Sequence, residues 1–148
     1  MPTASDTHIT NRWRVQPNHA NNYGTVHGGN VMKWMDEIGA MSAMRLAGEP
    51  CVTASIDRMN FHRPVPTGDV VVIESFVYDT GRTSVKVHLR ADRENPRTGD
   101  QEKTTESQFV FVAIDEAGKP VAVPDLRVES DEDEALRDRA VEWRENES

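Results

Sequence analysis

The sequence predicts an α+β fold in which one long helix packs against an antiparallel sheet. Residues 28–46 read as a helix that is apolar over most of its surface. One strand-like segment precedes this helix, and several follow it, separated by turn signals such as Asp79-Thr80-Gly81. A single helix followed by consecutive strands is typical of a helix that covers one face of a sheet.

Each element has its own local signal. Residues 9–15 form a short first strand, and residues 16–29 form a loop rich in Asn, Pro and Gly. Gly48 and Pro50 end the long helix. The alternation of apolar residues then changes phase, which predicts a β-bulge near Arg58. The remaining strands are expected at 51–61, 69–79, 83–91 and 104–115, and a polar helix is expected from Ser130.

Composition limits the possible functions. The chain has 148 residues and a net charge of −8, which indicates one soluble domain and argues against nucleic acid or an anionic membrane as the main partner. The N-terminus lacks the apolar segment of a signal peptide, so a cytoplasmic location is expected. Cys51 is the only cysteine, so no intrachain disulfide forms, and an inert core position is expected for it.

The acidic, lysine-poor composition has two readings that the sequence leaves open. It fits a halophilic protein of a salt-rich cytoplasm, and it also fits an ordinary soluble acidic protein. A loss of stability at low salt is expected only of the halophilic protein.

Asp36 stands out on the long helix. On a helical wheel, Asn30, Lys33 and Glu37 share the solvent-exposed edge, whereas Asp36 lies off that edge beside Met32 and small alanines that allow close approach to a sheet. An apolar environment sharpens a carboxylate as a base. The alternative is an exposed acid that pairs with Lys33. The alanines are Ala40, Ala43 and Ala47.

The start of the helix offers hydrogen-bond donors. Gly28 and Gly29 place unpaired N–H groups at the positive end of the helix dipole, where a polarised carbonyl oxygen could bind. A tight turn that needs glycine is the alternative. His27 is a possible acid or base, although a packed or capping histidine is more common, and Asn21 lies in a loop where asparagine usually forms turns.

The sequence lacks the motifs of several classes of enzyme and binding site. The sequence has no G-x-S-x-G motif and no glycine-rich nucleotide-binding loop. Its five histidines have no metal-ligand spacing with one another or with Cys51, so no metal and no separate cofactor are expected.

The motif N21-x-x-G-x-V-H-G-G29, followed by M35-D-E37, resembles the signature of hotdog-fold acyl-CoA thioesterases of the bacterial short-chain and brain types. The similarity continues through VTASIDRMNFHRPVPTGDVV, TGRTSVKV and FVFVAIDEAGKP, in the same order along residues 8–124. The resemblance implies a five-stranded antiparallel sheet wrapped around one helix. It also implies dimers with joined sheets, often assembled as trimers of dimers.

The resemblance assigns roles to individual residues. It implies that Asp36 is the general base or the nucleophile, and that Asn21 of the other subunit holds the water or the thioester. The N–H groups of Gly28 and Gly29 would polarise the thioester carbonyl. It also implies that coenzyme A, as part of the substrate, contacts a segment made of Arg82, Thr83 and Ser84, with Arg63 as a further candidate for a phosphate.

Two departures from the family pattern leave acyl-chain length open: Thr25 replaces Asp or Asn, and His27 replaces the Phe of bacterial members. Residues 1–126 are expected to form the thioesterase domain, and residues 127–148 an acidic helix or tail. The resemblance also implies a role in fatty acid metabolism. Two alternatives are a hotdog dehydratase or hydratase acting through His27 and Asp36, and a non-catalytic acyl-CoA sensor.

Overall fold

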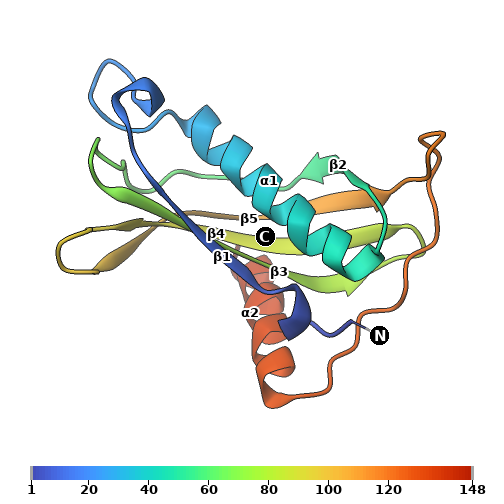
Figure 1. The fold of residues 1–148 in the computed structure, drawn as a ribbon. Coiled ribbons are helices and arrows are strands. Elements are labelled where there is room, and N and C mark those ends of the chain that lie inside the picture. Colours follow the sequence, from blue (N-terminus) through green and yellow to red (C-terminus); the bar gives the residue numbers. More distant parts are fainter. Residues whose placement is uncertain (1, 148) are drawn as a thin grey trace.

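The computed structural model describes residues 2–147 and has the predicted α+β architecture (Figure 1). Five antiparallel strands form one sheet in the order β1-β3-β4-β5-β2. A long helix, α1, covers one face, and a C-terminal helix, α2, lies on the other. The elements are η1 (Ser5–Thr7), β1 (Ile9–Arg14), η2 (Pro17–His19), α1 (Gly28–Ala47), β2 (Cys51–Ile56), β3 (Val70–Thr80), β4 (Ser84–Glu94), β5 (Gln101–Ala113) and α2 (Asp131–Glu147).

The strand predicted over 51–61 is shorter than expected, and its bulge lies at another position than predicted. β2 ends at Ile56, and the irregularity lies between Thr53 and Ser55, where Ala54 is the extra residue opposite β5. The prediction near Arg58 was wrong because the chain leaves the sheet after Ile56. The phase change at Met59 therefore reflects a loop that crosses the start of α1 and not a strand.

α1 packs against the sheet through an unusually close contact at Gly39. A Cβ atom at Gly39 would lie 3.1 Å from Cζ of Phe111 and 3.2 Å from Cδ1 of Leu89. Ala43 is fully buried on the same face, whereas Ala40 and Ala47 are partly buried. Small residues thus allow the close approach that the wheel predicted, with Gly39 at the tightest point.

The predicted polar helix is present as α2, and it packs on the outer face of the sheet through an apolar patch. Leu136 and Ala140 of α2 are buried against Phe76 and Tyr78 of β3. Burial of the Tyr78 hydroxyl raises its pKa to about 12. No helix within residues 2–147 has the length and apolarity needed to cross a membrane.

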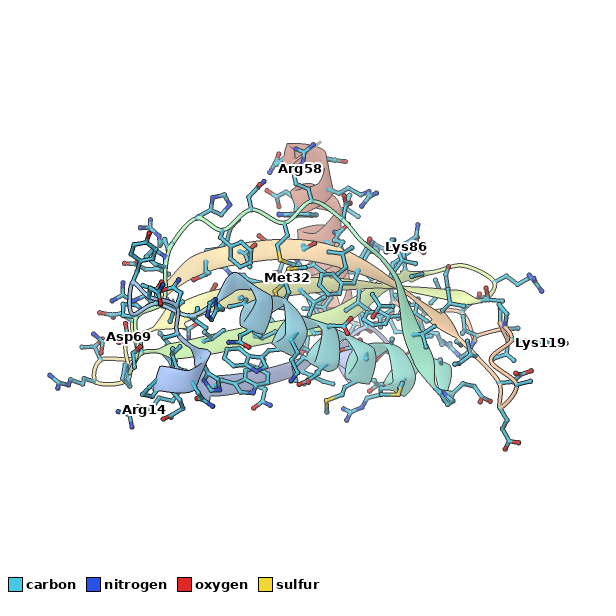
Figure 2. All side chains as sticks on the ribbon, turned by 90° about the horizontal axis from the view of Figure 1, so that it is seen from above. Arg14, Met32, Arg58, Asp69, Lys86 and Lys119 are labelled. Atoms are coloured by element: carbon cyan, nitrogen blue, oxygen red, sulfur yellow. The ribbon has the colours of Figure 1, made fainter. Side chains whose placement is uncertain are left out.

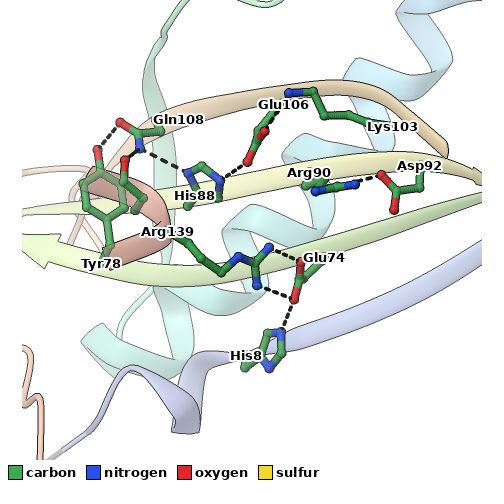
Figure 3. A network of polar contacts seen from close by, with 11 residues as sticks. His8, Glu74, Tyr78, His88, Arg90, Asp92, Lys103, Glu106, Gln108 and Arg139 are labelled. Atoms are coloured by element: carbon green, nitrogen blue, oxygen red, sulfur yellow. Dashed lines mark hydrogen bonds and ion pairs between the residues drawn. The ribbon is translucent and has the colours of Figure 1, made fainter. Parts of the chain in front are cut away.

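Figure 3 shows a network of hydrogen bonds that links Tyr78, Gln108, His88 and Glu106 on this side of the sheet. Gln108 accepts hydrogen bonds from Tyr78 Oη and Arg144 Nη1, both at 2.8 Å, and donates to the Ala140 carbonyl at 2.8 Å. It also donates to His88 Nδ1 at 3.1 Å, so the other ring nitrogen of His88 donates to Glu106 at 2.6 Å. The buried amide is therefore fully paired, as a polar group under a helix must be.

A charged cluster fixes the middle of α2. Arg139 donates two hydrogen bonds to the Glu74 carboxylate, at 3.1 and 2.7 Å, and His8 donates a third at 2.7 Å (Figure 3). Burial opposes ionisation of Glu74, but the hydrogen bonds from Arg139 and His8 outweigh it and lower the pKa to about 2.

We expect Glu74→Gln to lower the free energy of unfolding at neutral pH. Because the pKa of Glu74 falls from 4.5 to about 2 on folding, its charge stabilises the fold above pH 4.5, and this is lost as pH falls toward about 2. The difference between wild type and variant, measured by urea unfolding, should therefore shrink over that window. Glu142→Gln, on the exposed side of α2, is the control. A difference that does not change with pH would contradict this account.

Candidate active site

Asp36 lies two turns into α1 and faces β2. Its Oδ1 atom accepts a short hydrogen bond from Oγ1 of Thr53, and the carboxylate is partly buried. The hydroxyl thus occupies one oxygen of the carboxylate and leaves the other available. Asp36 is therefore held by the adjacent strand and does not lie in a purely apolar environment.

Asn21 lies in a turn that its own side chain closes. Its Oδ1 atom accepts from the N–H groups of Tyr23 and Thr25, at 2.9 and 3.2 Å, and its Nδ2 atom donates to Thr25 Oγ1 at 3.0 Å. Gly24 completes the turn with a φ of 77°, which favours glycine. The turn role is therefore observed, and one N–H of the partly exposed amide has no acceptor within residues 2–147.

Gly28 and Gly29 begin α1, as predicted. The first intrahelical acceptor, the His27 carbonyl, pairs with the N–H groups of Asn30 and Val31 at 3.0 and 3.3 Å. Gly28 and Gly29 precede these donors, so their N–H groups have no intrahelical acceptor. Nothing lies within 4 Å of a Cβ placed at Gly29, so this end of the helix is open to a ligand.

Phe61 covers the other glycine. A Cβ at Gly28 would lie 3.4 Å from the Phe61 ring, and that ring is 46% exposed. Phe61 belongs to the loop after β2, which passes over α1. Figure 2 shows this loop at Arg58 and shows Met32 on the side of α1 that faces it. Met32, one turn after Gly28, is 37% exposed.

The donors and the carboxylate are separated within one chain. Asp36 follows Gly28 by eight residues, which places the two about 12 Å apart along the helix axis. A reacting carbonyl needs the donors within about 3 Å of its oxygen and the base within hydrogen-bond reach of the attacking water, so both groups must lie beside the same atoms. One copy of the chain therefore does not bring the two halves of the predicted site together.

The predicted coenzyme A contacts lie at two different ends of the sheet. Arg82, Thr83 and Ser84 form the β3–β4 turn, at the end where α1 finishes (Figure 1). Arg63 follows Phe61, whose ring covers the start of α1, by two residues and pairs with Glu102 at 3.4 Å. The neighbouring β5 positions, Val112 and Thr104, are about 26 Å apart along the strand.

Two residues for which the sequence predicted other roles are also placed. His27 is the N-cap residue of α1, as expected of a capping histidine, but it caps through its backbone carbonyl, and its side chain is exposed. Cys51 is half-buried at the start of β2, and burial, with the nearby Glu49 charge, raises its pKa to about 11, so the thiol stays protonated. Within residues 2–147, no group of His, Cys, Asp and Glu could hold a metal ion.

Thr53 and Phe61 were missed by sequence reasoning. Neither lies in the glycine-rich motif, and each reaches the site through a contact with α1 that is distant in the sequence. The only available signal for Thr53 was its place in a strand that follows the helix directly.

The chain is similar to known thioesterases. The thioesterase superfamily model matches residues 23–99. YkhA of Bacillus subtilis, described as an uncharacterized acyl-CoA thioester hydrolase, is 38% identical over 129 residues, which cover 87% of this chain and 75% of that protein. An apo-hexameric acyl-CoA thioesterase has a TM-score of 0.86 at 38% identity, with 97% and 92% of the two chains covered.

The acyl-CoA hydrolase of Staphylococcus aureus, solved with butyryl coenzyme A and coenzyme A, has a TM-score of 0.85 at 32% identity, with 98% and 90% covered. Alanine variants of that hydrolase replace an asparagine, an aspartate 15 positions later and a threonine 17 positions after the aspartate. Asn21, Asp36 and Thr53 have the same spacing here. The chain belongs to the thioesterase superfamily, and its sheet wrapped around one helix is the hotdog fold.

Proposed function

We propose that this protein is an acyl-CoA thioesterase that hydrolyses acyl-CoA to a free fatty acid and coenzyme A. The observation that carries the proposal is the Asp36–Thr53 pair on the face of α1 toward β2. The shared spacing with the Staphylococcus aureus hydrolase supports it. A cytoplasmic location and a role in fatty acid metabolism belong to the same proposal.

The separation along α1 supports a site shared by two subunits. β2 is the last strand of the sheet, so one of its edges is unpaired, and its residues Val52 and Ile56 are 47% and 40% exposed. An apolar free edge favours pairing with a second strand. In a dimer joined at β2, Asn21 and the two glycines of one subunit would face Asp36 of the other. A trimer of such dimers is the larger assembly that we propose.

The chemistry follows from the groups present. A water molecule attacks the thioester carbonyl carbon while the free oxygen of Asp36 takes its proton. The N–H groups of Gly28 and Gly29 donate to the oxyanion. The C–S bond then breaks, and the proton held by Asp36 passes to the coenzyme A thiolate, which restores the carboxylate. Alternatively, Asp36 attacks directly, and water hydrolyses the resulting mixed anhydride. In both routes Thr53 orients the carboxylate by donating to Oδ1.

Two regions supply cationic side chains for coenzyme A. Arg82, beside Thr83 and Ser84, and Arg63 remain candidate phosphate contacts because a guanidinium fork suits phosphate. In the proposed dimer, the Arg82 region of one subunit and the Arg63 region of the other would contact the same substrate. The dehydratase alternative gains no support, since the His27 side chain is exposed and no hydrogen bond within residues 2–147 orients it as an acid or base.

Asp36→Asn should reduce kcat for acyl-CoA hydrolysis about a hundredfold or more, because the base is lost. Thiol release from acyl-CoAs of increasing chain length measures this and also defines chain-length preference. Glu37→Gln, the exposed neighbour on α1, is the matched control. Release that is unchanged in Asp36→Asn would show that the site is misassigned, and binding of acyl-CoA without release by wild type would favour a sensor.

Thr53→Val should lower kcat roughly tenfold, because the carboxylate loses the donor that orients it. Thr53→Ser keeps the hydroxyl and should retain most of the activity. Steady-state kinetics of the two variants, with thermal melting to check folding, distinguish an orienting hydroxyl from simple packing. Equal activity of the valine and serine variants would exclude the orienting role.

Co-expression of Asp36→Asn and Asn21→Ala chains should restore activity if the site is shared. Half of randomly mixed dimers pair the two variants, and each has one intact site, so about a quarter of the wild-type rate is expected. Differently tagged chains allow the mixed dimer to be purified and assayed. A mixed dimer as inactive as its parents would place both residues in a site within one chain.

A further inference from the structure

Ten of the thirteen arginines of this acidic protein have an interaction partner, Arg58 among them. Eight of them form ion pairs with carboxylates, as Arg93 does with Asp69 at 2.7 Å. Arg45 donates to the Asp6 carbonyl. Within residues 2–147, three arginines have a guanidinium with no such partner: Arg14, Arg82 and Arg97.

Two of these three unpaired arginines line one cavity. It has a volume of about 340 Å³ and lies between the segment 67–69 and the turn at 95–97, beside Arg14 at the end of β1. Figure 2 shows Arg14 and Asp69 at the end of the molecule where α1 begins. Asp69 also lines the cavity, but its ion pair with Arg93 neutralises its charge, so the cavity keeps two uncompensated positive charges.

We propose that this cavity, the Arg14–Arg97 cavity, binds a phosphate-bearing anion. Two guanidinium groups at one cavity match the charge of a phosphate dianion, and each can donate two parallel hydrogen bonds to its oxygens. Unpaired positive charges that share a cavity on a protein of net charge −8 repel each other, so an anion between them relieves that repulsion. The expected ligand class is a phosphate monoester or diphosphate.

The cavity adjoins the loop that carries Asn21. Thr67, in its lining, donates from its N–H and its Oγ1 to the Gly24 carbonyl, at 2.9 and 3.2 Å. Thr25 also forms a β-bridge with Pro66. A bound anion would therefore contact the segment that holds the Asn21 turn. The consequence for catalysis rests on the proposed function, whereas the anion site itself does not.

Two sources supply this chemistry: the phosphates of coenzyme A itself, and a separate phosphate compound that modulates the enzyme. Titration calorimetry at constant ionic strength, with inorganic phosphate and free coenzyme A as probes, tests the site directly. We expect Arg14→Gln and Arg97→Gln each to weaken phosphate binding roughly tenfold or more. Arg137→Gln, on the exposed side of α2, should bind as wild type does. Equal phosphate binding by wild type and by the double variant, which carries both Arg14→Gln and Arg97→Gln, would overturn the proposal. So would the absence of phosphate binding by wild type.

Kinetics with two substrates then identify the source. If the cavity holds the phosphates of coenzyme A, the double variant should raise KM for acyl-CoA at least tenfold and leave hydrolysis of the matching acyl-N-acetylcysteamine unchanged. If it holds a separate anion, KM should stay the same, and added phosphate should alter the rate of wild type alone. A chain that binds phosphate through these arginines but hydrolyses no thioester would contradict the proposed function and leave the anion site intact.

Discussion

The packing of α1 against the sheet is the constraint on which the site depends. Gly39 lets the helix approach Phe111 and Leu89 so closely that even a methyl group there would meet their side chains. This contact fixes the rotation of α1 about its axis. Met35 then points into the core, and the next residue, Asp36, points to β2 and meets Thr53. The position of the proposed catalytic carboxylate is thus set by core packing, because adjacent helical residues diverge by about 100°.

The helix also separates the groups that the proposed reaction needs together. The N–H groups at Gly28 and Gly29 are available because the helix begins there, and Asp36 is oriented because it lies inside the helix. The N–H groups and the carboxylate both belong to α1, which is rigid, so they cannot meet within one chain. The unpaired edge of β2 offers the solution that we propose, since a second copy would bring another helix start toward the carboxylate.

On the outer face of the sheet, charged and polar groups are paired with one another. Under α2, the polar groups of Gln108, His88 and Glu74 all have partners, and the charged residues beside them are paired. Because most charged groups are paired, guanidinium groups without a partner indicate where a ligand binds. Where an acidic protein leaves Arg14 and Arg97 uncompensated at one cavity, a ligand is a simpler explanation than chance exposure, because compensating carboxylates are abundant elsewhere on the surface.

The sequence by itself determined the elements with strong local signals: the apolar helix, its glycine start and Gly48 stop, the alternating strands, and Asp36, Asn21 and the two glycines as candidates. These signals lie within a few residues of one another, so no distant contact is needed to interpret them. Only the tertiary structure decided that Thr53 orients Asp36, that Phe61 covers Gly28, and that the irregularity of β2 lies at Ala54. Those features depend on strand register and on the path of a loop over α1, which are set by contacts between residues far apart in the chain.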